Sequence, residues 1–240
     1  MASDVTMKEL LEAGAHFGHK TSRWHPKMAP YIHSKRAGIH IIDLAKTVEG
    51  ITAAMHFISD TAASGKQVLL VGTKRQAQSI IKDAAIATKQ PYVSERWLGG
   101  MLTNWNTIGE RVKHLKELET RMATGELANR YSKLEVQRFK EEIDELNRLY
   151  GGIKEMNGKP GAIFVVDTLS DNNAIKEAMR IHIPIVAVVD SNSDPTQITY
   201  PIPANDDSIK TLTLISNLVK QAIEEGMAKK AKVVPKAKAE

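Results

Sequence analysis

Short apolar segments that alternate with amphipathic helical patterns constrain the fold of this chain more than any other feature. Strands are predicted at four places, residues 67–71, 91–94, 162–166 and 185–189. Helices are predicted at 43–64, 74–87, 172–181 and 206–226. Apolar strands alternating with helices indicate the α/β class, with a parallel sheet covered on both faces. A doubly wound, flavodoxin-like strand order is compatible with this pattern, although sequence alone does not fix the order.

The segment 104–150 interrupts this alternation. Apolar residues recur there at helical spacing in two stretches, first Ile108, Val112, Leu115, Leu118 and Met122, and then Val136, Phe139, Ile143, Leu146 and Tyr150. A seam this narrow covers only a partner helix, so we predict an inserted antiparallel coiled-coil hairpin that projects from the sheet. Each arm should span roughly 28 Å at 1.5 Å per residue. The α/β domain then consists of residues 43–103 and 151–226.

Residues 1–42 are predicted to form an N-terminal helix and a basic extended arm. Thr6 and Glu9 have the spacing of a capping box, and Gly14 ends the helix. Residues 16–36 lose periodicity before a strand at 39–42, and residues 16–46 carry six lysines and arginines against one aspartate. Such cations, interleaved with aromatic residues, contact phosphate and stack on unpaired bases. We predict RNA contacts at Lys20, Arg23, Trp24, Lys27, Lys35 and Arg36; the alternative is a solvated surface.

Composition excludes several classes of protein. The chain has no cysteine, so disulfides and thiolate metal sites are excluded. No apolar run approaches the ~18 residues of a membrane span, and the N-terminus lacks the regions of a signal peptide, so a cytoplasmic location is expected. Motifs of nucleotide-binding loops, serine hydrolases and zinc proteases do not occur, so no enzyme is predicted. The lysine-rich tail, residues 227–240, is predicted to be disordered.

Two further segments carry chemistry. Residues 72–75 place backbone N–H groups and two cations after a buried strand and before a helix, which suits an RNA phosphate better than a nucleotide cofactor. The alternative is a turn whose basic residues face water. Residues 96–105 hold two tryptophans and two adjacent glycines that fit a tight turn, and Thr103 or Asn104 can cap the following helix.

A divalent cation is a separate hypothesis. Asp190 follows a buried strand, Asp206 begins the last helix, and His19 on the basic arm could supply a nitrogen. Converging carboxylates repel one another, and a divalent ion relieves that repulsion. Two oxygens and one imidazole suit zinc, whereas oxygens and water alone suit magnesium. The alternative is that both aspartates are ordinary cap and turn residues, and no cofactor is required.

Blocks of sequence along nearly the whole chain resemble the family of bacterial small-subunit ribosomal protein two. They lie at residues 15–19, 24–28, 39–44, 71–75, 96–105, 151–154, 183–195 and 202–207. The resemblance implies a three-layer α/β/α domain with an inserted helical hairpin. It also implies rRNA binding between the head and body of the small subunit, and docking of small-subunit protein one, which captures messenger RNA. Within these blocks we predict further RNA contacts at Lys74, Arg75, Arg96, Trp97 and Asn104.

Two rival functions remain open from the residues alone. The first is an enzyme on the same fold that binds a nucleotide or sugar phosphate through residues 72–75 and Asp190. The second is a protein-interaction scaffold that uses the coiled coil. The favoured hypothesis expects small-subunit rRNA and neighbouring ribosomal proteins as partners, and neither a membrane nor a small-molecule substrate.

Overall fold

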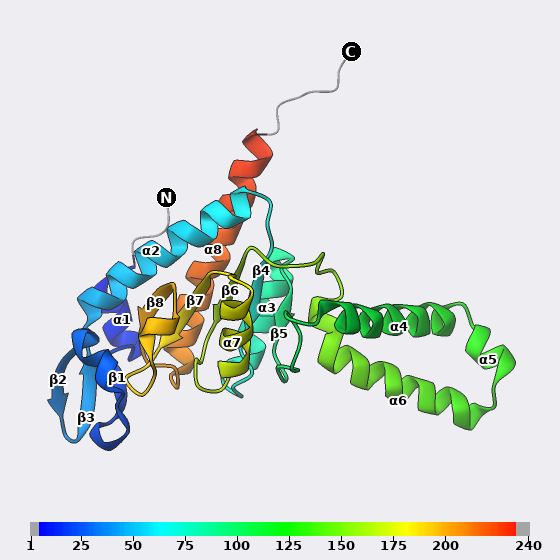
Figure 1. The fold of residues 1–240 in the computed structure, drawn as a ribbon, viewed down its shortest axis with the longest axis horizontal. Coiled ribbons are helices and arrows are strands. Elements are labelled where there is room, and N and C mark those ends of the chain that lie inside the picture. Colours follow the sequence, from blue (N-terminus) through cyan, green and yellow to red (C-terminus); the bar gives the residue numbers. More distant parts are fainter. Residues whose placement is uncertain (1–4, 234–240) are drawn as a thin grey trace, which may run out of the picture.

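A computed structural model describes residues 5–233, of which the side chains are described as far as Lys230 (Figure 1). Five parallel strands form the main sheet: β4 (Val68–Val71), β5 (Tyr92–Val93), β6 (Ala162–Val165), β7 (Ile185–Val189) and β8 (Tyr200–Pro203). Their spatial order is β5-β4-β6-β7-β8. In chain order this is 2-1-3-4-5, the flavodoxin-like arrangement. The predicted α/β class and doubly wound order are confirmed.

Alternate residues of each strand enter two separate cores, because successive side chains point to opposite faces of a sheet. On one face, Leu70 and Phe164 pack with the helices α2 (Leu44–Ala63), α3 (Gln78–Thr88) and α8 (Ile209–Val233). On the other face, Leu69 and Ile163 pack with α7 (Asn172–Arg180) and the root of the hairpin. The result is the three-layer α/β/α architecture.

Strand β8 was not predicted from the sequence. It contains Pro201 and Pro203, which lack the N–H group that a central strand needs. The structure places β8 at the edge of the sheet, where prolines are tolerated, with Ile202 paired to Val188. The low strand propensity of this segment therefore reflects its edge position.

Three predicted helix boundaries were wrong, the first being the start of the last helix: α8 begins at Ile209, and Asp206 lies in the loop before it. α3 begins at Gln78 rather than near residue 74, so a non-helical loop separates residues 72–75 from it. α8 continues past Gly226 to Val233, so residues 227–233 do not fit the predicted disorder, and residues 234–240 lie outside the described part. A Cβ on Gly226 would overlap the Ser59 carbonyl oxygen. This glycine therefore allows α2 and α8 to approach closely and does not end the helix.

The N-terminal helix agrees with its sequence pattern. In α1 (Met7–Ala13), Thr6 and Glu9 form the predicted capping box. Gly14 has φ 78°, and its N–H group donates to the carbonyls of Leu10 and Leu11. Asp43 caps α2 as predicted, accepting a hydrogen bond of 2.9 Å from the Ala45 N–H.

The predicted extended arm at 16–36 is instead folded into a small sheet. β1 (Phe17–Lys20), β2 (Ile32–Arg36) and β3 (Ile39–Ile42) pair antiparallel in the order β1-β3-β2. Two 3-10 helices, η1 (Thr21–Arg23) and η2 (Pro26–Tyr31), connect β1 to β2. Both Ala37 and Gly38 have positive φ, 49° and 77°, as a tight hairpin turn requires. Periodicity failed to reveal this sheet because four of the five β2 residues are exposed and both strand pairings contain register shifts.

The inserted segment is the predicted antiparallel hairpin, and it projects from the domain (Figure 1). Its arms are α4 (Trp105–Ala123) and α6 (Lys133–Tyr150), and a short unpredicted helix, α5 (Glu126–Arg130), forms the tip. At the root, Glu119 accepts hydrogen bonds from Asn147 at 2.7 Å and from Lys154 at 2.6 Å. Within residues 5–233, no helix combines the length and the apolar character that crossing a membrane requires.

The two residues expected in the hairpin seam differ in burial. Leu115 is fully buried, whereas Ile143 is only partly buried. Replacing Leu115 by alanine should therefore lower the local free energy of unfolding by about 2–5 kcal/mol, and Ile143→Ala should cost less. Hydrogen exchange of the α4 and α6 amides measures both losses, with the exposed Leu134→Ala as control. Equal losses at 115 and 143 would contradict this description of the seam.

Candidate nucleic-acid interface

Four cations of the small sheet are exposed and unpaired. Lys20, Arg23, Lys35 and Arg36 have no ion pair within the part of the chain that the structure describes. We call these four residues the basic sheet surface. Lys35 and Arg36 end the outer strand β2, and Lys20 ends β1. Their charges are free to meet an anion.

The indole ring of Trp24 lies within the same module. It stacks on the ring of His40 at a centroid distance of 5.0 Å, and the Lys35 Nζ atom lies 5.7 Å from the Trp24 ring centroid. His40 is fully buried, so it fixes one face of the indole. Its burial and the nearby charge of Lys35 lower the pKa of His40. Trp24 is thus held rigidly beside a cation, which is an arrangement that suits stacking on a base.

Lys27 differs from the other predicted cations because it has partners. Its Nζ atom lies 2.8 Å from Asp194 Oδ2 and 3.0 Å from Thr196 Oγ1. Hydrogen bonds from Lys27 and Thr196 lower the pKa of Asp194 to about 2. Lys27 therefore ties η2 to η4 (Pro195–Gln197), and part of its charge is neutralised.

The small sheet is attached to the carboxyl edge of the main sheet through Ser191, which follows β7. The His19 N–H donates to Ser191 Oγ at 2.7 Å, and the His25 N–H donates to the Ser191 carbonyl at 2.8 Å. A Cβ on Gly18 would lie 2.7 Å from Ser191 Oγ, so only glycine permits this approach. The basic sheet surface is consequently fixed relative to the α/β domain.

Beneath this attachment, the loops that follow the parallel strands bring three aspartates around Lys74 and a fourth against His19. Lys74 Nζ lies 2.6 Å from Asp207 Oδ1, 2.8 Å from Asp206 Oδ1 and 3.4 Å from Asp167 Oδ2. The fourth, Asp190, lies 3.1 Å from His19 Nδ1. Lys74 therefore serves as an internal counter-ion and is not free at the surface, whereas its neighbour Arg75 is exposed.

The electrostatics of this cluster follow from burial and like charges. Burial, together with the charges of Asp167 and Asp190, raises the pKa of Asp206 to about 7. Burial opposes the charge of Lys74, but its hydrogen bonds to Asp206 and Asp207 outweigh this and raise its pKa. A hydrogen bond to Asp190 raises the pKa of His19 despite partial burial. The cluster thus holds more negative charge than one lysine neutralises.

The structure brings together some, but not all, of the predicted metal ligands. Ligand atoms of His19, Asp206 and Asp207 lie within 4.8 Å of one another. Asp207 was not predicted, because strand β8, which precedes it, was missed, and without that strand nothing places this residue beside the ends of the parallel strands. Asp190, which was predicted, lies against the other nitrogen of His19. These groups could hold zinc with an open position, and a cation here remains a hypothesis.

Replacing Lys74 by glutamine tests whether this lysine alone balances the charge of the aspartates, or whether a bound zinc ion can also balance it. Removing one partner of a buried ion pair costs about 3–5 kcal/mol, so Lys74→Gln should lower the free energy of unfolding by that amount in metal-free buffer at pH 8. Adding zinc should restore part of the loss if His19, Asp206 and Asp207 bind it jointly. Urea denaturation measures both effects, with the exposed Arg75→Gln as control. If zinc shifts neither the variant nor the native protein, the metal hypothesis fails.

Residues 97–103 wrap around one carboxylate, Glu177 of α7. Its Oε1 atom accepts hydrogen bonds from Trp97 Nε1 at 3.0 Å and from the Gly100 N–H at 2.8 Å. Its Oε2 atom accepts from the Leu102 N–H at 3.0 Å and from both the N–H and the hydroxyl of Thr103, at 3.1 and 3.0 Å. Sequence reasoning missed Glu177, which looks like any other polar residue of an amphipathic helix.

This arrangement changes how the predicted contacts at 96–104 are understood. Trp97 is buried and packs in the core beneath α7, whereas Arg96 and Asn104 are exposed. Asn104 precedes α4 but its side chain does not cap the helix. Arg96 and Asn104 are therefore available to a partner, and the first role of Trp97 is structural.

Glu177→Gln should lower the free energy of unfolding by about 1.5–3 kcal/mol, because an amide cannot accept all five hydrogen bonds. Burial opposes ionisation of Glu177, but the hydrogen bonds from Trp97, Gly100, Leu102 and Thr103 outweigh it and lower its pKa below 4.5. A lowered pKa stabilises the fold above pH 4.5, and that stabilisation is lost as the pH falls through the folded value. Denaturation between pH 3 and 7 should therefore show a shallower acid loss in the variant than in the native protein. Parallel curves would contradict this role.

The fold is that of a doubly wound α/β protein with two appended modules, a basic sheet and a projecting hairpin. A family model described as Ribosomal protein S2 matches residues 10–226. The chain is 50% identical over 226 residues to Small ribosomal subunit protein uS2 of Sinorhizobium medicae, an alignment that covers 94% of this chain and 88% of the relative. It is 51% identical over 222 residues to the protein of that name from Roseiflexus castenholzii, covering 92% and 84%.

A third relative, Small ribosomal subunit protein uS2 of Chloroflexus aggregans, is 50% identical, with 94% of each chain covered. The chain therefore belongs to the Ribosomal protein S2 family. The resemblance drawn from the sequence blocks is confirmed.

Proposed function

We propose that the protein is a structural constituent of the small ribosomal subunit, in the cytoplasm, that binds rRNA through the basic sheet surface. Family membership supports the ribosomal role. The observation that carries the RNA contact is the set of four exposed, unpaired cations on a rigid module beside the stacked ring of Trp24. Phosphates meet the cations, and the indole offers a surface to an unpaired base.

The remaining predicted contacts differ in their availability. Arg75, Arg96 and Asn104 are exposed and join the proposed interface as peripheral contacts. Lys74 and Trp97 are occupied by the aspartate cluster and by Glu177, so they support the interface from within. Lys27 contributes less than the other cations because Asp194 already holds its ammonium group.

The finer placement follows from the family resemblance. We propose a position between the head and body of the subunit and a part in docking small-subunit protein one, which captures messenger RNA. The projecting hairpin is the element that neighbouring ribosomal proteins could reach without displacing the basic sheet surface (Figure 1). Cross-linking within purified subunits tests this placement, and hairpin cross-links to rRNA alone would contradict the protein-docking role.

The enzyme hypothesis has less support in the geometry. A nucleotide phosphate at residues 72–75 needs an open loop and a free cation. A Cβ on Gly72 would lie 2.8 Å from Ile81, so this backbone packs against α3, and Lys74 is held by three aspartates. The loop therefore favours a structural role.

Replacing Lys20, Arg23, Lys35 and Arg36 by glutamine should weaken binding to small-subunit rRNA. Each lost phosphate contact on single-stranded RNA lowers the slope of log K against log salt by ~0.7, so the slope should fall by about 3. Lys27→Gln serves as control and should change the slope by less than one such contact, because its ammonium group is already paired. An unchanged slope in the fourfold variant, with the fold intact by circular dichroism, would refute the proposed interface.

A further inference from the structure

A second concentration of basic residues lies at the amino ends of the parallel strands, on the side of the main sheet opposite the small sheet. At this amino edge the strands begin and the helices α2, α3, α7 and α8 end. The basic residues there are Lys66, Lys89, Lys159, His182, Lys229 and Lys230, which we call the amino-edge surface. All six are exposed, and none forms an ion pair within residues 5–230. Among the described residues, the Lys229 side chain alone of these six donates a hydrogen bond, to Ser59 Oγ at 3.0 Å.

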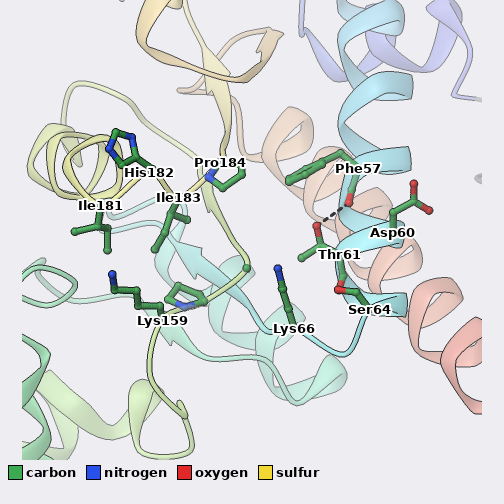
Figure 2. Close-up of a pocket in the computed structure, with 12 residues that line it drawn as sticks. Phe57, Asp60, Thr61, Ser64, Lys66, Lys159, Ile181, His182, Ile183 and Pro184 are labelled. Atoms are coloured by element: carbon green, nitrogen blue, oxygen red, sulfur yellow. Dashed lines mark hydrogen bonds between the residues drawn. The ribbon is translucent and has the colours of Figure 1, made fainter.

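A cavity of about 570 Å³ opens in this surface between the last turns of α2 and the segment 181–184 (Figure 2). The side chains of Lys66 and Lys159 rise from its floor, while Phe57 and Pro184 stand along the wall opposite Lys159. The ring of Phe57 stacks on Tyr200 at a centroid distance of 4.4 Å, which fixes its position. One acidic residue, Asp60, lies on the rim, and it is paired with His56 at 3.1 Å.

The shape and chemistry of the cavity suit one nucleotide. Its volume lies within the range of small-ligand sites, which is roughly 300–1,000 Å³. Apolar walls can cover a base, and the ammonium groups of Lys66 and Lys159 can meet phosphate oxygens. A second, smaller pocket next to it is lined by Lys66 and Lys230, so the positive charge continues along the edge.

Backbone strain at two of these basic residues is an independent observation. Lys89 ends α3 with φ 53°, and His182 follows α7 with φ 57°. Such positions favour glycine, because a Cβ is strained at positive φ, and α2 indeed uses Gly65 there with φ 81°. A cation near a helix C-terminus is favourable without this strain, and α7 already has Arg180 in its last turn. Strained non-glycine residues that persist point to a role outside the fold.

We propose that the amino-edge surface binds the phosphate backbone of an unpaired rRNA segment and takes one of its nucleotides into the cavity. This segment differs from the RNA at the basic sheet surface, because the two surfaces lie at opposite ends of the strands. The proposal rests on the proposed function only in naming the polyanion as rRNA. The protein then joins two RNA segments that contact opposite ends of the strands of its main sheet.

Charge removal tests the surface in the full-length chain. Lys66→Gln with Lys159→Gln should lower the salt slope of binding to small-subunit rRNA by about 1.4, since each contact on single strands accounts for ~0.7. The matched control is Lys8→Gln with Lys210→Gln, which removes two exposed lysines far from this edge and should leave the slope unchanged. Equal slopes in the two double variants would overturn the proposal. If substitutions at neither this surface nor the basic sheet surface lower the salt slope of rRNA binding, the proposed function is refuted as well.

Glycine substitution separates binding from folding. In Lys89→Gly with His182→Gly, the stability against urea should stay the same or rise, because the strain is removed, while rRNA affinity falls. A merely structural role predicts unchanged affinity, and that result would count against the proposal.

The absence of cysteine permits a direct localisation, because one introduced thiol is unique. A hydroxyl-radical probe on Lys159→Cys should cleave rRNA at sites distinct from those of a probe on Arg36→Cys. Cleavage sites shared with Arg36→Cys would show a single RNA segment, and absence of cleavage from position 159 would show that this surface is not an RNA contact. Either result overturns the proposal.

Discussion

The carboxylate of Glu177 fixes the turn at residues 97–103, through which the chain passes from the α/β domain into the projecting hairpin. The chain leaves the sheet after β5 and must turn into α4, and five donors in residues 97–103 converge on this one group. An ionised acceptor makes each of these hydrogen bonds stronger than a neutral one would be. Because α7 packs on the face of the sheet, the position of the hairpin follows from that of the sheet.

How much of the fold the sequence predicts depends on how the local pattern relates to burial. β4, β6 and β7 are buried on both sides, and their continuous apolar runs located them within a residue or two. β8 carries prolines and β2 is exposed along most of its length, so neither strand has the expected pattern, and only pairing with the adjacent strand, β3 for β2 and β7 for β8, makes them strands. Gly226 looks like a helix stop but is required by the approach of α2, which no local rule reveals.

For the candidate site, the sequence showed which residues carry positive charge, but not which of them are paired with aspartates in the fold. The cations between Lys20 and Arg36 could be recognised from charge and aromatic content alone. That Lys27 is neutralised by Asp194, or that Lys74 is surrounded by aspartates from two loops, depends on contacts between segments more than 90 residues apart. Glu177 and the amino-edge lysines carry no motif, since their importance comes from where helices end and loops fold back.

Within the described chain the hairpin is held at its root by several contacts: Lys154 donates to Glu119 at 2.6 Å, Lys116 pairs with Glu155 at 3.0 Å, and Leu115 packs in the same core as the sheet residue Leu69. Mechanically this root acts as a clamp, and the parts of the two arms beyond it project without support from the α/β domain (Figure 1). A load at the tip bends the two arms together and reaches the sheet only as a torque on this clamp. The length of the arms is therefore a free design variable, because matched whole turns added to α4 and α6 would move the tip outward and leave every contact of the α/β domain as it is.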